Sequence, residues 1–151
     1  MPTRRTRKRR KRRSNAVQVA VRASGLPPAR ALRRWARAAG AAQATMRIVG
    51  AAEGRRLNRA FRDQDYATNV LTFQYGRRPP RGDIVLCHPV IAREARAQGK
   101  SLAAHYAHLV VHGVLHLRGH DHRGKTETRR MERLEIRLLG RLGFGNPYGL
   151  E

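Results

Sequence analysis

Cysteine is nearly absent from this chain, which has one, Cys87, in 151 residues. A lone cysteine excludes an internal disulfide scaffold, and its place in the apolar run 84–87 predicts a small buried side chain. Long apolar stretches are also lacking: none approaches the roughly 20 residues of a membrane span, and the N-terminus has no apolar core of a secretory signal. We therefore expect a cytoplasmic protein without a membrane segment.

Acidic residues are scarce as well, so the charge balance is strongly basic. Ten Asp and Glu stand against 33 Lys and Arg, which gives a formal net charge of +23. Such an excess favours a polyanionic partner because basic side chains neutralise phosphates. Nucleic acid is the first candidate and an anionic membrane the second.

Part of this charge lies in an N-terminal arm. Residues 1–13 (MPTRRTRKRRKRR) carry nine of the basic residues and no acidic one. We expect the arm to be disordered on its own and to contact RNA phosphates; the alternative is a solubilising extension or a cloning remnant. The rest of the chain keeps 24 basic residues against ten acidic ones, so it is basic in its own right. Residues 14–151 are expected to form a single domain with its own core.

Hydrophobic periodicity predicts an α+β protein. Four segments have strand patterning: 15–23, 44–49, 69–75 and 83–87. Five segments have helical spacing: 27–39, 51–62, 89–98, 102–118 and 126–142. The segment 76–82 (GRRPPRG) is expected to be an irregular loop. We expect a small mixed four-stranded sheet packed with about five helices, one of which is central, buried and carries metal ligands.

All seven histidines fall between His88 and His122. His112 and His116 are four residues apart, so on a helix their imidazoles project from one face, as a shared metal ion requires. Gly119 permits a left-handed turn that ends the helix and would bring His122 back toward the same point. Three imidazoles leave a tetrahedral ion one open position for water, whose pKa the ion lowers. That arrangement is typical of a catalytic site.

Alternatives remain for this cluster. A pair of histidines at this spacing often shares no ligand, but the helix is apolar around most of its circumference, where unpaired imidazoles would be costly. His120 competes with His122 as the third ligand, and imidazoles suit nickel, copper and iron as well as zinc. His105 and His108 lie too far back along the helix for the same ion, so we expect them to line solvent or a substrate cleft.

The segment 112–122 parallels the zinc-peptidase pattern H-E-x-x-H-x-x-G-x-x-H, whose glutamate is the general base. Gly113 occupies the glutamate position, so a peptidase would lack its base, and close helix packing is a sufficient reason for the glycine. Asp121 is the nearest candidate carboxylate. It would either orient an imidazole or accept a proton.

Three stretches resemble one known family. They are Leu57–Asn58 with Phe61–Arg62, Asp65 and 68–73 (TNVLTF); 82–86 (GDIVL); and 112–122 with the C-terminal helix. From about residue 15 to the end, their order and spacing resemble the YbeY family, endoribonucleases specific for single-stranded RNA and required for ribosomal RNA maturation. The resemblance implies one zinc ion per chain, held by His112, His116 and His122, and it places the family's substrate-side arginine on Arg62.

A guanidinium suits that role because it holds a phosphate by paired hydrogen bonds and offsets transition-state charge. From composition alone, Arg62 is one more surface arginine. Two features depart from the family pattern. Gln74 replaces a common proline, and 76–81 is short and basic where relatives usually carry longer, more acidic sequence, so we expect the rim of the cleft to differ.

The resemblance makes a zinc-dependent endoribonuclease the leading interpretation, with roles in ribosomal RNA processing, ribosome maturation and quality control, and with the small ribosomal subunit as partner. Water activated by the metal, or a ribose hydroxyl, would attack a phosphodiester held by basic residues, with Arg62 as the clamp. The alternative is an RNA-binding ribosome-assembly factor whose metal only stabilises the fold, which the basic charge fits equally well. A metallopeptidase is third, and Gly113 argues against it.

Overall fold

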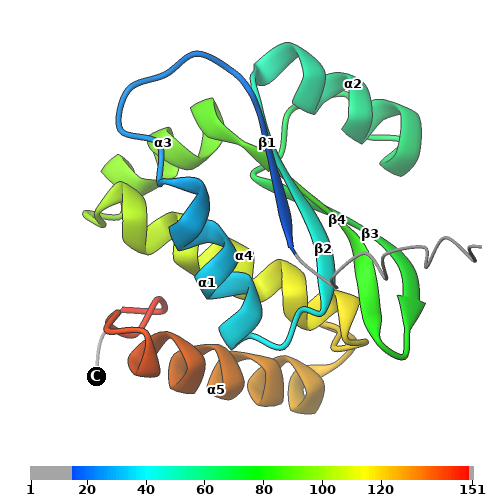
Figure 1. The fold of residues 1–151 in the computed structure, drawn as a ribbon, viewed down its shortest axis with the longest axis vertical. Helices are drawn as coiled ribbons and strands as arrows, with labels where there is room; N and C mark the ends of the chain where they lie inside the picture. The colour runs from blue at the N-terminus through cyan, green and yellow to red at the C-terminus, as the bar shows by residue number, and fades with distance from the viewer. Residues whose placement is uncertain (1–14, 150–151) are drawn as a thin grey trace, which may run out of the picture.

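The computed structural model describes residues 15–149, and its centre is a four-stranded sheet (Figure 1). The strands are β1 (Ala16–Ala20), β2 (Gln43–Val49), β3 (Val70–Arg77) and β4 (Pro80–Cys87). Their order across the sheet is β1-β2-β4-β3, with β1, β2 and β4 parallel and β3 antiparallel to β4. The predicted mixed sheet is confirmed. The predicted arm, residues 1–13, lies outside the described residues.

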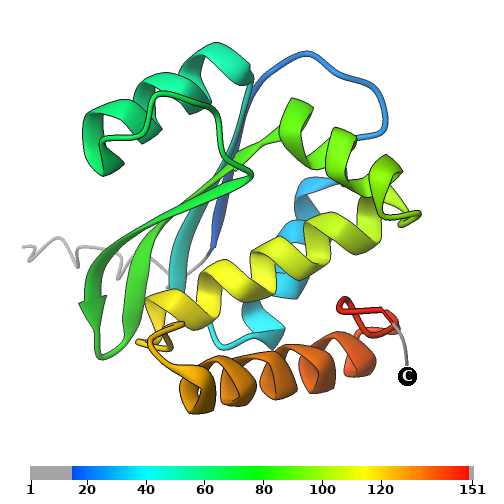
Figure 2. The same ribbon diagram turned by 180° about the vertical axis from the view of Figure 1, so that it is seen from behind.

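Five helices of the described chain pack around this sheet. They are α1 (Ala29–Ala38), α2 (Ala51–Arg62), α3 (His88–Ala97), α4 (Leu102–Leu117) and α5 (Lys125–Arg141). Figures 1 and 2 show α1 and α4 on one face, α2 on the other, and α5 alongside α4 on the side away from the sheet. The α+β class with about five helices is therefore confirmed.

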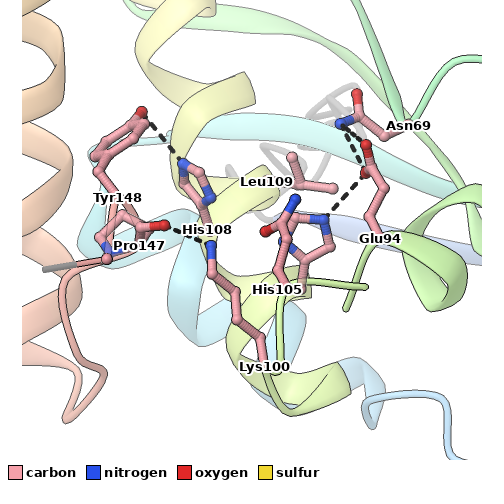
Figure 3. A pocket seen from close by; sticks show the side chains of 10 residues that line it. Asn69, Glu94, Lys100, His105, His108, Leu109, Pro147 and Tyr148 are labelled. Atoms are coloured by element: carbon pink, nitrogen blue, oxygen red, sulfur yellow. Dashed lines mark hydrogen bonds and ion pairs between the residues drawn. The ribbon is translucent and has the colours of Figure 1, made fainter. Parts of the chain in front are cut away.

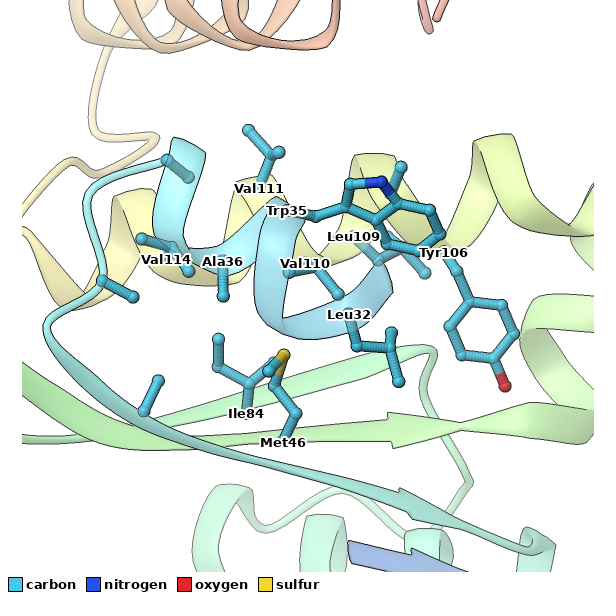
Figure 4. Packing of buried hydrophobic residues seen from close by; sticks show 14 of the residues in the cluster. Leu32, Trp35, Ala36, Met46, Ile84, Tyr106, Leu109, Val110, Val111 and Val114 are labelled. Carbon is cyan, nitrogen blue, oxygen red and sulfur yellow. The ribbon is translucent and has the colours of Figure 1, made fainter. Parts of the chain in front are cut away.

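Successive side chains along each strand point to opposite faces of the sheet, so the apolar residues form two separate clusters. Met46 and Ile84 point toward α1 and α4 and belong to the main core (Figure 4). Val85 and Cys87 point the other way, into a smaller cluster that Leu57 of α2 covers. Cys87 is 1% exposed, which confirms the prediction of a small buried residue. Each large aliphatic side chain buried in this way contributes roughly 1.5–3 kcal/mol, so both faces of the sheet hold the layers together.

α4 is the central helix that the sequence predicts. The Ser101 hydroxyl accepts the backbone N–H of Ala104 at 3.1 Å and so caps its first turn. Ten of its 16 residues are buried. At Gly113, an added Cβ would lie 3.0 Å from Cγ2 of Ile84 and 3.3 Å from Cγ2 of Thr72, so the glycine permits the predicted close packing on the sheet. No helix in the described part of the chain is long and apolar enough to cross a membrane.

The prediction of an irregular loop at 76–82 is wrong. Only residues 78–79 separate β3 from β4, and both strands extend into the predicted loop. Pro80 is tolerated because it is the first residue of its strand. Gly82 is required inside β4, since an added Cβ would lie 2.1 Å from the carbonyl oxygen of Phe73. Antiparallel pairing therefore prevails over the local preferences of proline and glycine.

Candidate metal centre

Three histidines meet at the C-terminal end of α4. His112 and His116 project from the helix one turn apart, His122 follows in the turn before α5, and one ring nitrogen of each lies within 4.8 Å of the others. Nε2 of His112 lies 3.0 Å from Nε2 of His116 and 3.2 Å from Nε2 of His122. Two nitrogens bound to one tetrahedral zinc ion are about 3.3 Å apart, so the three side chains fit a single ion.

Hydrogen bonds at the opposite ring nitrogens define the protonation of two of these histidines. His112 donates its Nδ1–H to Oε1 of Glu135 at 2.8 Å, and His116 donates its Nδ1–H to the carbonyl oxygen of His120 at 3.0 Å. A carboxylate and a carbonyl only accept, so in each neutral ring Nδ1 carries the proton and Nε2 presents a lone pair. Two lone pairs 3.0 Å apart repel each other unless a cation lies between them. The donor set therefore suits a divalent transition-metal ion.

Sequence patterns did not single out Glu135, a completely buried carboxylate on α5. It also accepts the Nε2–H of His108 at 2.8 Å and the hydroxyl of Tyr148. Burial raises the pKa of Glu135, but the hydrogen bonds from His108, His112 and Tyr148 outweigh burial and hold that pKa at about 2. A signal was present in the sequence, because Glu135 lies one turn after Met131 on the apolar face of its helix, where acids are almost never found without partners.

The turn after α4 brings His122, rather than His120, into the cluster. Gly119 ends the helix with a φ of +95°. Oδ1 of Asp121 then accepts the backbone N–H of His122 at 2.7 Å and orders the turn. His120 contributes its carbonyl oxygen to His116, while its ring is not among the three that converge.

The cluster combines a His116 ring that is kept neutral with one side that is open to solvent. Burial lowers the pKa of His116, and the neighbouring His112 and His122 lower it further. His116 is therefore neutral at pH 7, as a metal ligand must be. His112 and His116 are half-buried, whereas His122 is exposed, so a large substrate can approach from the side of His122.

Arg62, the last residue of α2, has an exposed guanidinium beside β3. Its Nη2 donates to the carbonyl oxygen of Thr72 at 2.7 Å, its Nη1 donates to that of Phe61 at 3.1 Å, and Cζ lies 5.0 Å from the centre of the Phe73 ring. α4 packs against the Thr72 side chain at Gly113, so a single strand connects Arg62 to the helix that carries the cluster. No hydrogen bond among residues 15–149 joins Arg62 directly to a histidine.

Asp121 lies at the surface beside the cluster. Its carboxylate is 48% exposed, accepts from the backbone of His122, and has Oδ2 3.0 Å from Nε of Arg123. The structure therefore shows Asp121 ordering the turn through the backbone, and its hydrogen bonds do not include an imidazole.

One to two turns earlier, α4 lines a pocket of about 510 Å³ (Figure 3). Its walls include Asn69, Glu94, Lys100, His105, His108 and Tyr148. His105 is 3% exposed, and its Nε2 lies 3.1 Å from Oε1 of Glu94. Burial lowers the pKa of His105. His105 and His108 therefore line a pocket, as expected, although His105 is almost completely buried and does not face solvent. That this pocket is a substrate cleft stays a prediction.

Comparison with known proteins identifies the family of this chain. The profile of the family described as Endoribonuclease YbeY matches residues 29–143. The chain belongs to the YbeY endoribonuclease family. The Endoribonuclease YbeY of Aromatoleum aromaticum is 53% identical over 138 residues, which cover 87% of this chain and 90% of the relative. That of Bordetella avium is 53% identical over 148 residues, covering 88% and 91%, and that of Bordetella pertussis is 62% identical over 100 residues, covering 64% of each chain.

The YbeY assignment agrees with the fold. A solution structure of a Thermotoga maritima protein superposes with a TM-score of 0.51, at 23% identity, over 84% of this chain and 91% of the other. At that identity the superposition supports the fold alone. Family membership places this YbeY chain among enzymes that hydrolyse RNA phosphodiester bonds, and its histidine cluster is consistent with metal dependence.

Proposed function

We propose that this protein is a zinc-dependent endoribonuclease that cleaves single-stranded ribosomal RNA in the cytoplasm, in ribosome maturation and quality control. The small ribosomal subunit is the proposed partner. The observation that carries the proposal is the convergence of the Nε2 atoms of His112, His116 and His122, while Nδ1 of each of the first two faces an oxygen acceptor. Membership of an endoribonuclease family supports the same conclusion.

His112, His116 and His122 are the proposed ligands of one zinc ion per chain. When bound, the ion supplies Lewis acidity and a water of lowered pKa for attack on a phosphodiester. The side chains themselves supply neutral nitrogen donors, which also suit nickel, copper and iron. The half-buried position of His112 and His116 limits water around the site, while exposed His122 leaves room for RNA.

Arg62 is the proposed phosphate clamp. Two of its N–H groups bond to backbone carbonyls, which leaves three of the five guanidinium donors for a phosphate and for charge that develops in the transition state. Asp121 is exposed next to His122 and is the proposed acceptor of the proton that the attacking water or ribose hydroxyl loses. The basic body and the arm at 1–13 supply sequence-independent attraction for RNA.

The proposal is tested by cleavage of a single-stranded ribosomal RNA fragment and by elemental analysis of the pure protein. Wild-type protein is expected to contain one equivalent of zinc and to cut the RNA. His112→Ala and His116→Ala are expected to lose the zinc and at least a hundredfold of the cleavage rate, because each removes one of three ligands. His120→Ala is the matched control, since its ring is not in the cluster, and it is expected to keep both.

The basic charge of the chain also fits a second function, a metal-stabilised RNA-binding factor in ribosome assembly. The same experiment separates the two. Wild-type protein that holds zinc and binds RNA tightly but never cuts it would establish the binding factor and overturn the nuclease proposal.

A further inference from the structure

We propose that Glu135 is a positioning residue for the metal centre: its carboxylate holds His112 in the one tautomer and orientation that binds a metal ion through Nε2. The inference rests on the proposed metal site and adds to it a residue from a different helix. It applies to the metal-free protein as well as to the metal-bound protein, because the hydrogen bond between Glu135 and His112 is present without a metal ion.

The geometry of one hydrogen bond carries the first step. Oε1 of Glu135 lies 2.8 Å from Nδ1 of His112. A neutral imidazole in water exchanges its proton between two nitrogens, and only the form with the proton on Nδ1 leaves Nε2 free for this site. A buried carboxylate at Nδ1 selects that form and restricts rotation of the ring. Carboxylate partners of this kind orient metal-binding histidines in many proteins.

The other oxygen of Glu135 is held just as firmly. Oε2 accepts the Nε2–H of His108 at 2.8 Å and the hydroxyl of Tyr148, so the carboxylate cannot turn away from His112 without breaking both bonds. The three donors come from α4 and from the C-terminal segment, and they compensate the cost of burying the charge. His108 and Tyr148, which are not among the three clustered histidines, therefore hold the Glu135 carboxylate in place.

The atoms of His108, His112 and Glu135 also lie close enough together to suggest a second metal site. Hydrogen bonding explains them better. The two nitrogen-to-oxygen distances are both 2.8 Å, the usual length of a charge-assisted hydrogen bond, whereas two ligand atoms of one tetrahedral zinc ion are about 3.3 Å apart. One ion per chain, supported by Glu135, is the arrangement that these distances favour.

The test measures zinc affinity and the His112 tautomer in the full-length protein. Zn²⁺ is titrated against a chromophoric chelator for wild type, Glu135→Gln and Glu135→Met. We expect the dissociation constant to rise 10- to 100-fold in both variants, and more in the methionine variant, which offers His112 no acceptor. Glu132→Gln, on the same helix, is the control: the Glu132 carboxylate makes no hydrogen bond within the described residues, and we expect unchanged affinity.

Nitrogen NMR of the metal-free protein gives a readout that general destabilisation would not imitate. At a pH where His112 is neutral, we expect the proton on Nδ1 in wild type and a mixture of tautomers in Glu135→Met. A neutral His112 with its proton on Nε2 in wild type would overturn the inference, and this measurement does not depend on any variant folding. A stoichiometry of two zinc ions, one of them lost in Glu135→Gln, would overturn it as well.

His112→Ala separates this inference from the proposed function. If it binds zinc as wild type does, the metal centre itself is wrong. If it loses zinc while Glu135→Gln and Glu135→Met bind normally, the metal centre stands and only the role of Glu135 is wrong.

Discussion

Arg62, the proposed phosphate clamp, lies at the surface of the fold. It is exposed at the end of α2, and its two hydrogen bonds go to the carbonyl oxygens of Phe61 and Thr72. Cζ of Arg62 also lies over the Phe73 ring, 5.0 Å from its centre, which is within the range of a cation–π contact. Such an arginine can leave one backbone carbonyl and take up a phosphate with little change elsewhere.

We therefore expect Arg62→Lys to lower the single-turnover cleavage rate about 10- to 100-fold, because lysine cannot form the paired hydrogen bonds of a guanidinium. Zinc content should stay the same. The control is Arg59→Lys, an exposed arginine one turn earlier on α2. Rapid-quench cleavage assays measure the rate, and elemental analysis measures the zinc content. Because both variants keep the positive charge, equal rate losses would contradict a specific clamping role for the Arg62 guanidinium.

At the residue scale, the sequence predicts what depends on spacing along one helix. His112 and His116 are four residues apart, so their convergence follows from helical geometry. Glu135 could not be placed in the same way, because it lies 23 residues beyond His112 and reaches it only through the packing of α5 on α4. A charge on an apolar helix face signals a partner, but the identity of that partner is a tertiary property.

At the scale of elements, α4 serves as both core and scaffold for the cluster. Gly113 stands directly after His112 and faces Ile84 and Thr72 of the sheet. Side-chain volume at this position would push the helix away from the strands and shift the neighbouring ligands. This tight contact also explains why the glutamate of the peptidase pattern has no room here.

Gly113→Glu is accordingly expected to lower the free energy of unfolding by at least about 3 kcal/mol, since it overpacks the contact and buries an unpaired carboxylate. Urea denaturation of the metal-free protein measures the change. Gly140→Glu is the matched control, because an added Cβ at Gly140 of α5 meets no atom within 4 Å. Its effect should stay within about 1 kcal/mol, and a comparable loss at both positions would contradict the packing argument.

Every predicted helix and strand overlaps an observed one, and the failure at 76–82 has a specific cause. Gly76, Pro79, Pro80 and Gly82 disfavour regular structure locally, yet the strands pair up to a two-residue turn. Gln74 also anchors the hairpin of β3 and β4 to α4, because its amide Nε2 donates to the carbonyl oxygen of Leu117 at 2.8 Å. The local preferences of single residues for strands or turns do not predict pairing between strands or contacts between distant elements.

At the scale of the whole molecule, basic charge far exceeds what one active site needs. The arm at 1–13 holds nine positive charges, and the remaining chain is basic without it. We propose that the arm increases affinity for RNA without taking part in metal binding.

Deleting residues 1–13 should then flatten the slope of log affinity against log salt by up to about 6, since a single strand releases roughly 0.7 ion per neutralised phosphate. Zinc content should not change. Fluorescence anisotropy with a labelled single-stranded RNA across a salt series gives the slope. A full-length control with the nine basic residues replaced by glutamine should match the deletion, and an unchanged slope would exclude the arm from binding.

The origin of Glu135 on α5 has a consequence for biosynthesis. When a nascent polypeptide has emerged only as far as residue 122, all three imidazoles are outside the ribosome, but the carboxylate that orders one of them, on α5, has yet to emerge. Capture of the ion therefore becomes strong only once the last helix has emerged and docked. A product that ends before residue 135 would lack this carboxylate and, on the proposed role of Glu135, would bind the metal ion more weakly than the chain that carries α5.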